Sequence, residues 1–260
     1  MGFTTFIVYA IIGAMNCKII IQYDGTRYDG WQKQTNTDNT IQGKLEKILT
    51  RMSGYPVEVH GAGRTDAGVH ALGQTANFHL KEPADPAQVR TYLNRYLPDD
   101  IEITDIAEVP KRFHSRLNAD NKTYVYRIGT DESKSVFNRK YRYHYGEHLD
   151  VELMERAASC CIGSHDFKGF CANKRMKKST VRTLNAITFE QKEHDLEIAY
   201  TGNGFLYHMV RILTGTLIEI GGGKRPPEDI KKILEGKDRQ LAGFTAPALG
   251  LTLLKVRYEE

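Results

Sequence analysis

A carboxylate and a guanidinium stand two residues apart in the glycine-rich run Gly61-Ala-Gly-Arg-Thr-Asp-Ala-Gly-Val-His-Ala71. Where a backbone is extended, residues i and i+2 point to the same face, so Arg64 can hold Asp66 ionised and aimed. A carboxylate held in this way can act as a nucleophile or as a general base. Taken alone, an Arg-x-Asp pair is more often a weak ion pair in an exposed turn.

Two tyrosines and one arginine elsewhere in the chain are further candidates. Tyr124 lies in an alternating, strand-like segment, where a tyrosine is usually a packing residue, and Tyr126 shares its face. Arg211 lies in the otherwise apolar segment 205–220, which predicts a buried helix. A charge there is costly unless it is paired. We therefore expect Arg211 to bind a carboxylate, either in a structural salt bridge or in an active site.

Two basic stretches are candidates for contacts with RNA phosphates. Residues 139–145 alternate cations with aromatic rings, and residues 173–182 carry five cations, which include Lys174, Arg175, Lys177 and Lys178. Phosphate neutralisation and ring stacking both fit this composition, and so does a solvated charged face. The histidines and cysteines show no metal-ligating spacing, so we expect no metal.

The elements that must position these residues have a split-βαβ order in the first half of the chain. Strands are expected at 16–23, 56–60, 73–80 and 101–109, and helices at 40–52 and 85–96, where Asp85 and Pro86 have the pattern of a helix start. The order β-α-β-β-α-β is that of a ferredoxin-like unit. It places Arg64 and Asp66 in the loop between the second and third strands.

The second half of the chain repeats this order loosely. Strands are expected at 122–130, 181–190, 196–201 and 251–258, and helices at 150–162, 205–220 and 226–234. We therefore predict an α+β fold of two ferredoxin-like halves with mainly antiparallel sheets, an N-terminal domain at 15–116 and a C-terminal domain at 117–260. Two such sheets meeting edge to edge would leave a catalytic cleft between them.

The composition is typical of a globular protein outside the disordered and membrane classes, with 40% hydrophobic and 26% charged residues. Lysine and arginine exceed aspartate and glutamate by 36 to 32, which permits RNA binding without demonstrating it. No segment has the 18 or so apolar residues of a membrane span. The four cysteines fit a reduced, cytoplasmic compartment. We expect Met15 to be the true start, with 1–14 a mis-assigned or disordered extension.

Several blocks of the chain, in a constant order from residue 17 almost to the end, resemble the TruA family of tRNA pseudouridine synthases. The run 61–71 is similar to the family's catalytic-aspartate signature. Ile21-Gln-Tyr-Asp-Gly-Thr-Arg-Tyr-Asp-Gly-Trp-Gln32 resembles its opening strand and loop. Phe113-His-Ser-Arg116 and Lys122-Thr-Tyr-Val-Tyr-Arg127 resemble the segment of its active-site tyrosine. Blocks at 163–167, 202–211 and 245–251 are similar to its later motifs.

The resemblance implies a cofactor-free isomerase that converts uridine to pseudouridine at positions 38–40, in the anticodon stem-loop of tRNA. It implies that Asp66 is the nucleophile or base, that Arg64 orients it, that Tyr124 binds the flipped uracil and that Arg211 pairs with Asp66 across the cleft. It also implies a homodimer in the cytoplasm. The alternative that stays open is a non-catalytic RNA-binding protein of the same fold. A nucleoside hydrolase is disfavoured because it typically needs two facing carboxylates, and one stands out here.

Overall fold

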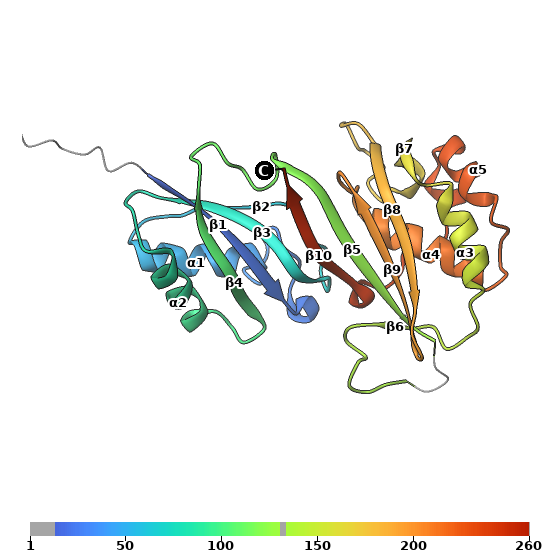
Figure 1. Cartoon of the computed structure of the whole chain (residues 1–260), viewed down its shortest axis with the longest axis horizontal. Helices are drawn as coiled ribbons and strands as arrows, with labels where there is room; N and C mark the ends of the chain where they lie inside the picture. The colour runs from blue at the N-terminus through green and yellow to red at the C-terminus, as the bar shows by residue number, and fades with distance from the viewer. Residues whose placement is uncertain (1–13, 131–133, 260) are drawn as a thin grey trace, which may run out of the picture.

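The computed structural model describes residues 14–130 and 134–259, so the N-terminal extension discussed above lies, except for Ala14, outside the described residues. The first half follows the predicted order of elements (Figure 1). Its strands and α-helices are β1 (Met15–Tyr23), α1 (Ile41–Ser53), β2 (Val59–Gly61), β3 (His70–Leu80), α2 (Pro86–Tyr96) and β4 (Ile101–Val109). The predicted cap of α2 is present, since the Asp85 side chain accepts a hydrogen bond from the Ala87 N–H.

The second half contains the predicted elements and two short strands that were not predicted, β6 (Tyr143–His144) and β7 (Gly163–Asp166). Its other elements are β5 (Ala119–Gly129), α3 (Val151–Ser159), β8 (Val181–Gln191), β9 (Asp195–Gly202), α4 (Met209–Gly221), α5 (Asp229–Gly236) and β10 (Leu251–Tyr258). Helix α4 begins at residue 209, not at 205 as predicted, because His208 takes a left-handed backbone conformation with φ 60°. Within the described ranges, no helix combines the length and the apolarity needed to cross a bilayer.

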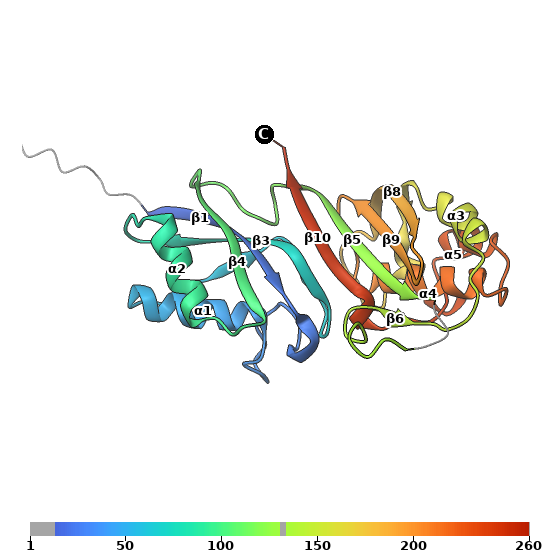
Figure 2. The same cartoon turned by 60° about the horizontal axis from the view of Figure 1, so that its bottom comes forward.

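The strands form one sheet with the order β4-β1-β3-β10-β5-β9-β8-β7, to which β2 adds beside β3 and β6 beside β5. The orders β4-β1-β3-β2 and β10-β5-β9-β8 are each that of a split-βαβ unit. The two sheets meet edge to edge, as expected, and they form one continuous sheet because β10 pairs in parallel with β3 across the junction. Figures 1 and 2 show β10 and β5 in the middle of the molecule, with α1 and α2 on one side and α3 to α5 on the other.

Alternation along the strands gives the sheet a helix-covered face and an open face. On β5, Tyr124 pairs with Leu253 of β10 and with Tyr200 of β9, and all three are buried. The Tyr200 hydroxyl lies 2.8 Å from the Thr214 hydroxyl of α4, so this is the helix-covered face. Residues next to these along the strands, such as Thr252, point to the open face.

Candidate active site

A cleft of about 1460 Å³ lies at the junction of the two halves, on the helix-covered face of the sheet. Its walls come from the loop between β2 and β3, from β5 and from residues 205–211 at the start of α4. These segments carry three of the residues singled out in the sequence, and the cleft brings them together: Asp66, Tyr124 and Arg211.

The loop that carries Asp66 is anchored on both sides of the carboxylate. The Trp31 N–H donates to the Thr65 carbonyl over 3.0 Å, and the Val69 N–H donates to the Asp66 carbonyl over 3.1 Å. The Thr65 hydroxyl lies 2.8 Å from the Tyr23 hydroxyl in the buried interior. Because its neighbours are bonded to the first half of the molecule, the carboxylate has a fixed starting position.

The Asp66 carboxylate meets two side chains from the second half of the molecule. The Arg211 guanidinium donates to its Oδ2 over 3.1 Å, and Nε2 of His208 lies 3.4 Å from the same oxygen. Arg211 is itself fixed by donating to the Ala246 carbonyl over 2.7 Å. The predicted pair of Arg211 and Asp66 is therefore present. Across residues 14–130 and 134–259, no hydrogen bond or ion pair involves Oδ1, which leaves that oxygen for a substrate.

Arg64 lines the same cleft, but its exposed side chain forms no ion pair or hydrogen bond within the described part of the chain. This corrects the expectation that Arg64 orients Asp66, a place that Arg211 takes. The physical reason lies in the backbone. Strand β2 ends at Gly61 and β3 begins at His70, so residues 64–66 lie in a loop with no strand ladder to fix Arg64 and Asp66 on one face. Arg64 is left able to face RNA.

His208 is a site residue that the sequence did not reveal, beyond its place three residues before Arg211. Its φ of 60° is uncommon outside glycine, and such backbone strain clusters at functional sites. Its ring stacks on Tyr207 with the centroids 3.8 Å apart. Burial lowers the pKa of His208, and the charge of Arg211 adds to this while Asp66 opposes it. A neutral imidazole still offers one N–H, which can be directed at Asp66.

The two rival tyrosines differ in where their hydroxyls lie. The Tyr126 hydroxyl donates to the Pro247 carbonyl over 2.8 Å, and the Tyr126 side chain is fully buried. Tyr124 lines the cleft and packs edge-on against Phe205, with the ring centroids 5.1 Å apart. Its hydroxyl has no hydrogen-bond partner within the described residues, and burial raises the pKa of Tyr124 so that the proton is retained. Of the two, Tyr124 is therefore the one that can meet a substrate.

The predicted basic stretches divide between surface and interior. One of the four cations named in 173–182 lines the cleft, Lys178, and the others lie on the same exposed loop: Lys174, Arg175 and Lys177. The stretch 139–145 is not simply a free surface, because Arg142 is 5% exposed and pairs with Asp195 at 2.5 Å. Of the two stretches, 173–182 is thus the one that borders the cleft.

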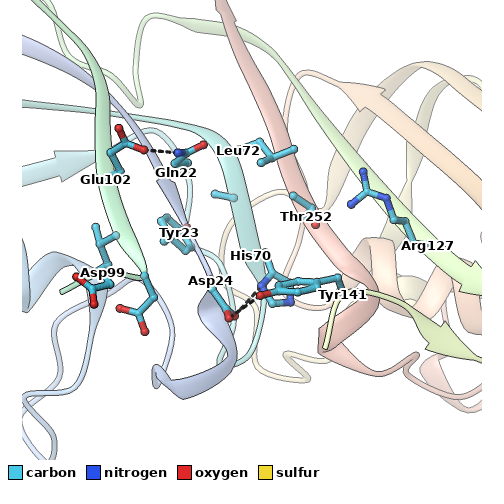
Figure 3. Close-up of a pocket in the computed structure, with 13 residues that line it drawn as sticks. Gln22, Tyr23, Asp24, His70, Leu72, Asp99, Glu102, Arg127, Tyr141 and Thr252 are labelled. Carbon is cyan, nitrogen blue, oxygen red and sulfur yellow. Dashed lines mark hydrogen bonds and ion pairs between the residues drawn. The ribbon is translucent and has the colours of Figure 1, made fainter. Parts of the chain in front are cut away.

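A smaller hollow of about 280 Å³ lies at the same junction on the open face of the sheet (Figure 3). Thr252 lines this hollow, whereas its neighbour Leu251 lines the cleft, so the two sites are on opposite faces. Four carboxylates line the hollow: Asp24, Asp99, Asp100 and Glu102. Figure 3 shows the Tyr141 side chain reaching Asp24, to which its hydroxyl donates over 3.0 Å. The hollow is acidic, while cations predominate in the cleft.

Comparison with known proteins connects the cleft to a family. The family model described as tRNA pseudouridine synthase matches residues 19–118 and 157–259. A tRNA pseudouridine synthase A of Bacillus sp. (strain KSM-64) is 50% identical over 238 residues, which cover 92% of this chain and 97% of that protein. A tRNA pseudouridine synthase A 1 of Clostridium tetani (strain Massachusetts / E88) is 45% identical over 243 residues, which cover 94% and 99%. Among solved structures, the match to a Cbf5-Nop10-Gar1 complex covers 78% of this chain and 45% of the matched chain, at 11% identity. The TM-score is 0.36, and we infer nothing from so weak a similarity.

Proposed function

Because the chain belongs to the tRNA pseudouridine synthase family, we propose that Asp66 is its catalytic carboxylate and that the cleft receives a uridine flipped out of tRNA. The enzyme is an isomerase that makes pseudouridine in tRNA. One observation carries the assignment of Asp66. Arg211 donates to Oδ2 and His208 lies beside the same oxygen, while Oδ1 has no protein partner within the described residues, so one oxygen is held and the other is available.

The reaction needs a carboxylate at the sugar. The bond between N1 of uracil and C1′ of ribose breaks, the uracil turns, and its C5 bonds to C1′. In the balance N1 gains a proton and C5 loses one. Asp66 can attack C1′ as a nucleophile, or it can take the ribose 2′ proton as a base to give a glycal. Both routes start from the same ionised oxygen.

The neighbours of Asp66 have the same roles in either route. The guanidinium of Arg211 holds Oδ2 of Asp66 and fixes the rotation of the carboxylate, and His208 lies beside the same oxygen. The ring of Tyr124 can stack on the flipped uracil, and its protonated hydroxyl can relay the proton of C5. Arg64, exposed in the cleft, is placed to meet a phosphate near the target.

We further propose that the target uridines are those at positions 38–40 of the anticodon stem-loop, as the family resemblance implies. The exposed cations of residues 174–178 would hold the tRNA backbone beside the cleft. The enzyme would act in the cytoplasm as a homodimer, each chain dividing into units at 15–116 and 117–260. Equilibrium sedimentation at micromolar concentration tests the dimer, and a single species of monomer mass would remove it.

The test of this function is a modification map. Purified protein is incubated with unmodified tRNA transcripts in the presence of a chelator, and pseudouridine is located at single-nucleotide resolution. We expect it at positions 38–40 and nowhere else. Pseudouridine confined to another arm would overturn the proposed target, and a tRNA with none would contradict the proposed function of the cleft.

A further inference from the structure

Three cations of the cleft form no ion pair with a carboxylate in the part of the chain that the structure describes. Arg116 precedes β5, Lys122 lies in β5 and Arg182 lies in β8, and all three line the cleft. The Lys122 amine makes no hydrogen bond or ion pair within the described ranges. The Arg182 guanidinium donates only to backbone carbonyls, those of Ser179 over 3.0 Å and Val181 over 2.6 Å. We call these three residues the inner cations.

The carboxylates of the same cleft are engaged elsewhere. Asp66 holds Arg211, and Asp29 accepts a hydrogen bond from the Thr37 hydroxyl over 2.6 Å. Glu58 lies 3.7 Å from the imidazole of His60 at the rim, where its side chain is 75% exposed. Among residues 14–130 and 134–259, therefore, no carboxylate of the cleft partners the inner cations.

Three neighbouring positive charges without a carboxylate partner destabilise the folded protein. Burial lowers the pKa of Lys122 to about 8, and the positive charges of Arg116 and Arg182 add to the effect. Burial also lowers the pKa of Arg182, with Arg116 adding to it. A charge that is unfavourable in the free protein and has no partner is a mark of a site that awaits a ligand of opposite charge.

The position of Lys122 identifies the part of the substrate that it would meet. Lys122 and Tyr124 are two residues apart on β5, so their side chains leave the same face about 7 Å apart. Gly63 of the Asp66 loop lies opposite both. A Cβ built on Gly63 would be 3.4 Å from the Tyr124 hydroxyl and 3.9 Å from Cδ of Lys122. A nucleotide whose base covers Tyr124 and whose ribose meets Asp66 carries its backbone past Lys122.

We propose that Lys122, flanked by Arg116 and Arg182, binds one backbone phosphate next to the target uridine. This inference rests on the proposed function, because it needs the uridine to lie between Asp66 and Tyr124. Lys122 and Arg182 are half-buried, whereas Arg116 and the cations at 174–178 are exposed. The cations at 174–178 can follow the tRNA backbone without any base entering the cleft. The inner cations meet their phosphate when the nucleotide is flipped in, and they thereby link recognition of the backbone to placement of the ribose.

The test is a double-mutant cycle between the Lys122 side chain and single phosphates of the tRNA. Unmodified tRNAs are assembled by ligation with a single neutral methylphosphonate at each linkage of the anticodon loop in turn. Binding of each is measured to wild-type protein and to Lys122→Met, with Lys174→Met as the exposed control. At one linkage beside the target uridine, we expect the methylphosphonate to weaken tRNA binding by wild-type protein about tenfold, or about 1.4 kcal/mol. The same substitution should not weaken tRNA binding by Lys122→Met any further, because the lysine that meets this phosphate is already absent. Lys174→Met should retain the full tenfold loss there.

Additive losses for Lys122→Met at every linkage would overturn the phosphate site. The melting temperature separates this outcome from misfolding, because removing the half-buried, unpaired charge of Lys122 should raise the melting temperature. A lower melting temperature with unchanged tRNA binding would show a purely structural lysine. Arg182→Gln provides a second variant with the same expected coupling. Pseudouridine formation by wild-type protein on the all-phosphate tRNA is recorded in parallel. If it occurs without the coupling, the phosphate site alone fails, and if it does not occur, the proposed function itself fails.

Discussion

The two hollows at the junction of the halves differ in how their charges are partnered. In the acidic hollow, Asp24 accepts hydrogen bonds from the Thr26 N–H over 2.9 Å and from the Tyr141 hydroxyl over 3.0 Å. Asp100 accepts the Arg27 Nε–H over 3.0 Å, and Arg127 donates to Glu197 over 2.8 Å. In the cleft on the other face, Lys122, Arg64 and Oδ1 of Asp66 have no such partner in the described part of the chain.

The difference separates charges that serve the fold from charges that serve a substrate. In the hollow, Tyr141 of the second half reaches Asp24 of the first, so this bond joins the two halves. A polar group that already has its protein partners gains little from a ligand, whereas an unpartnered one gains a full interaction. Substitutions in the hollow should therefore affect stability, and substitutions in the cleft should affect catalysis.

The largest difference between the faces is expected for two arginines. Arg211→Met removes the donor that holds Oδ2 of Asp66, and the rate of pseudouridine formation should fall about 10³-fold. Arg127→Met, on the open face, breaks a partly exposed pair with Glu197 and should leave that rate within about threefold. Single-turnover kinetics on unmodified tRNA measure both. Equal losses of rate in Arg211→Met and Arg127→Met would contradict the functional distinction between the cleft and the hollow.

A smaller loss is expected when only one hydroxyl is removed from the cleft. Tyr124→Phe keeps the ring that stacks on uracil and removes the group that relays a proton, so the rate should fall about 10²-fold with tRNA affinity unchanged. The matched control is Tyr126→Phe, which loses a bond to the Pro247 carbonyl on the buried side. It should lower the melting temperature and leave the rate per folded molecule unchanged. A Tyr124→Phe enzyme at wild-type rate would limit Tyr124 to stacking.

The smallest effect on catalysis is expected in the hollow. Burial alone would raise the pKa of Asp24, but hydrogen bonds from Thr26 and Tyr141 hold it below its usual value of 3.8. The stabilisation is thus present above pH 3.8 and is lost as the pH falls through the lower, folded-state pKa. Asp24→Asn should lower the melting temperature at pH 7 by about 2–4 °C, and the difference from wild type should vanish in strong acid. A difference that grows on acidification would contradict this account.

Much of the fold could be predicted because its signals are local. The cap at Asp85 and the apolar stripe of α1 place helices without reference to the rest of the chain. The meeting of the two sheets edge to edge was expected, but the strands that join them were not, since the junction depends on two parallel residue pairs between β3 and β10, far apart in sequence. The start of α4 was missed because residues 205–208 are largely apolar and only the left-handed backbone of His208 excludes them from the helix.

The site was predictable where a charged side chain lies in a buried segment and must therefore have a partner of opposite charge. An arginine on an apolar helix must find an acid, so the pairing of Arg211 with Asp66 followed from sequence pattern and family resemblance together. The pairing of Arg64 with Asp66 assumed strand-like alternation, and both residues lie in the loop between β2 and β3, outside any strand. Lys122 gave no local signal at all, because its lack of a partner depends on β8 and on the chain before β5.

The central claim is that the unpartnered oxygen of Asp66 performs the chemistry, and one paired measurement tests it most directly. Asp66→Asn and Asp24→Asn make the same change on opposite faces of the junction, and pseudouridine formation on unmodified tRNA is followed in a single turnover. The account predicts no detectable product over hours for Asp66→Asn, with tRNA binding within a few-fold of wild type, and a near-normal rate for Asp24→Asn. An Asp66→Asn protein that still forms pseudouridine at a tenth of the wild-type rate would contradict it.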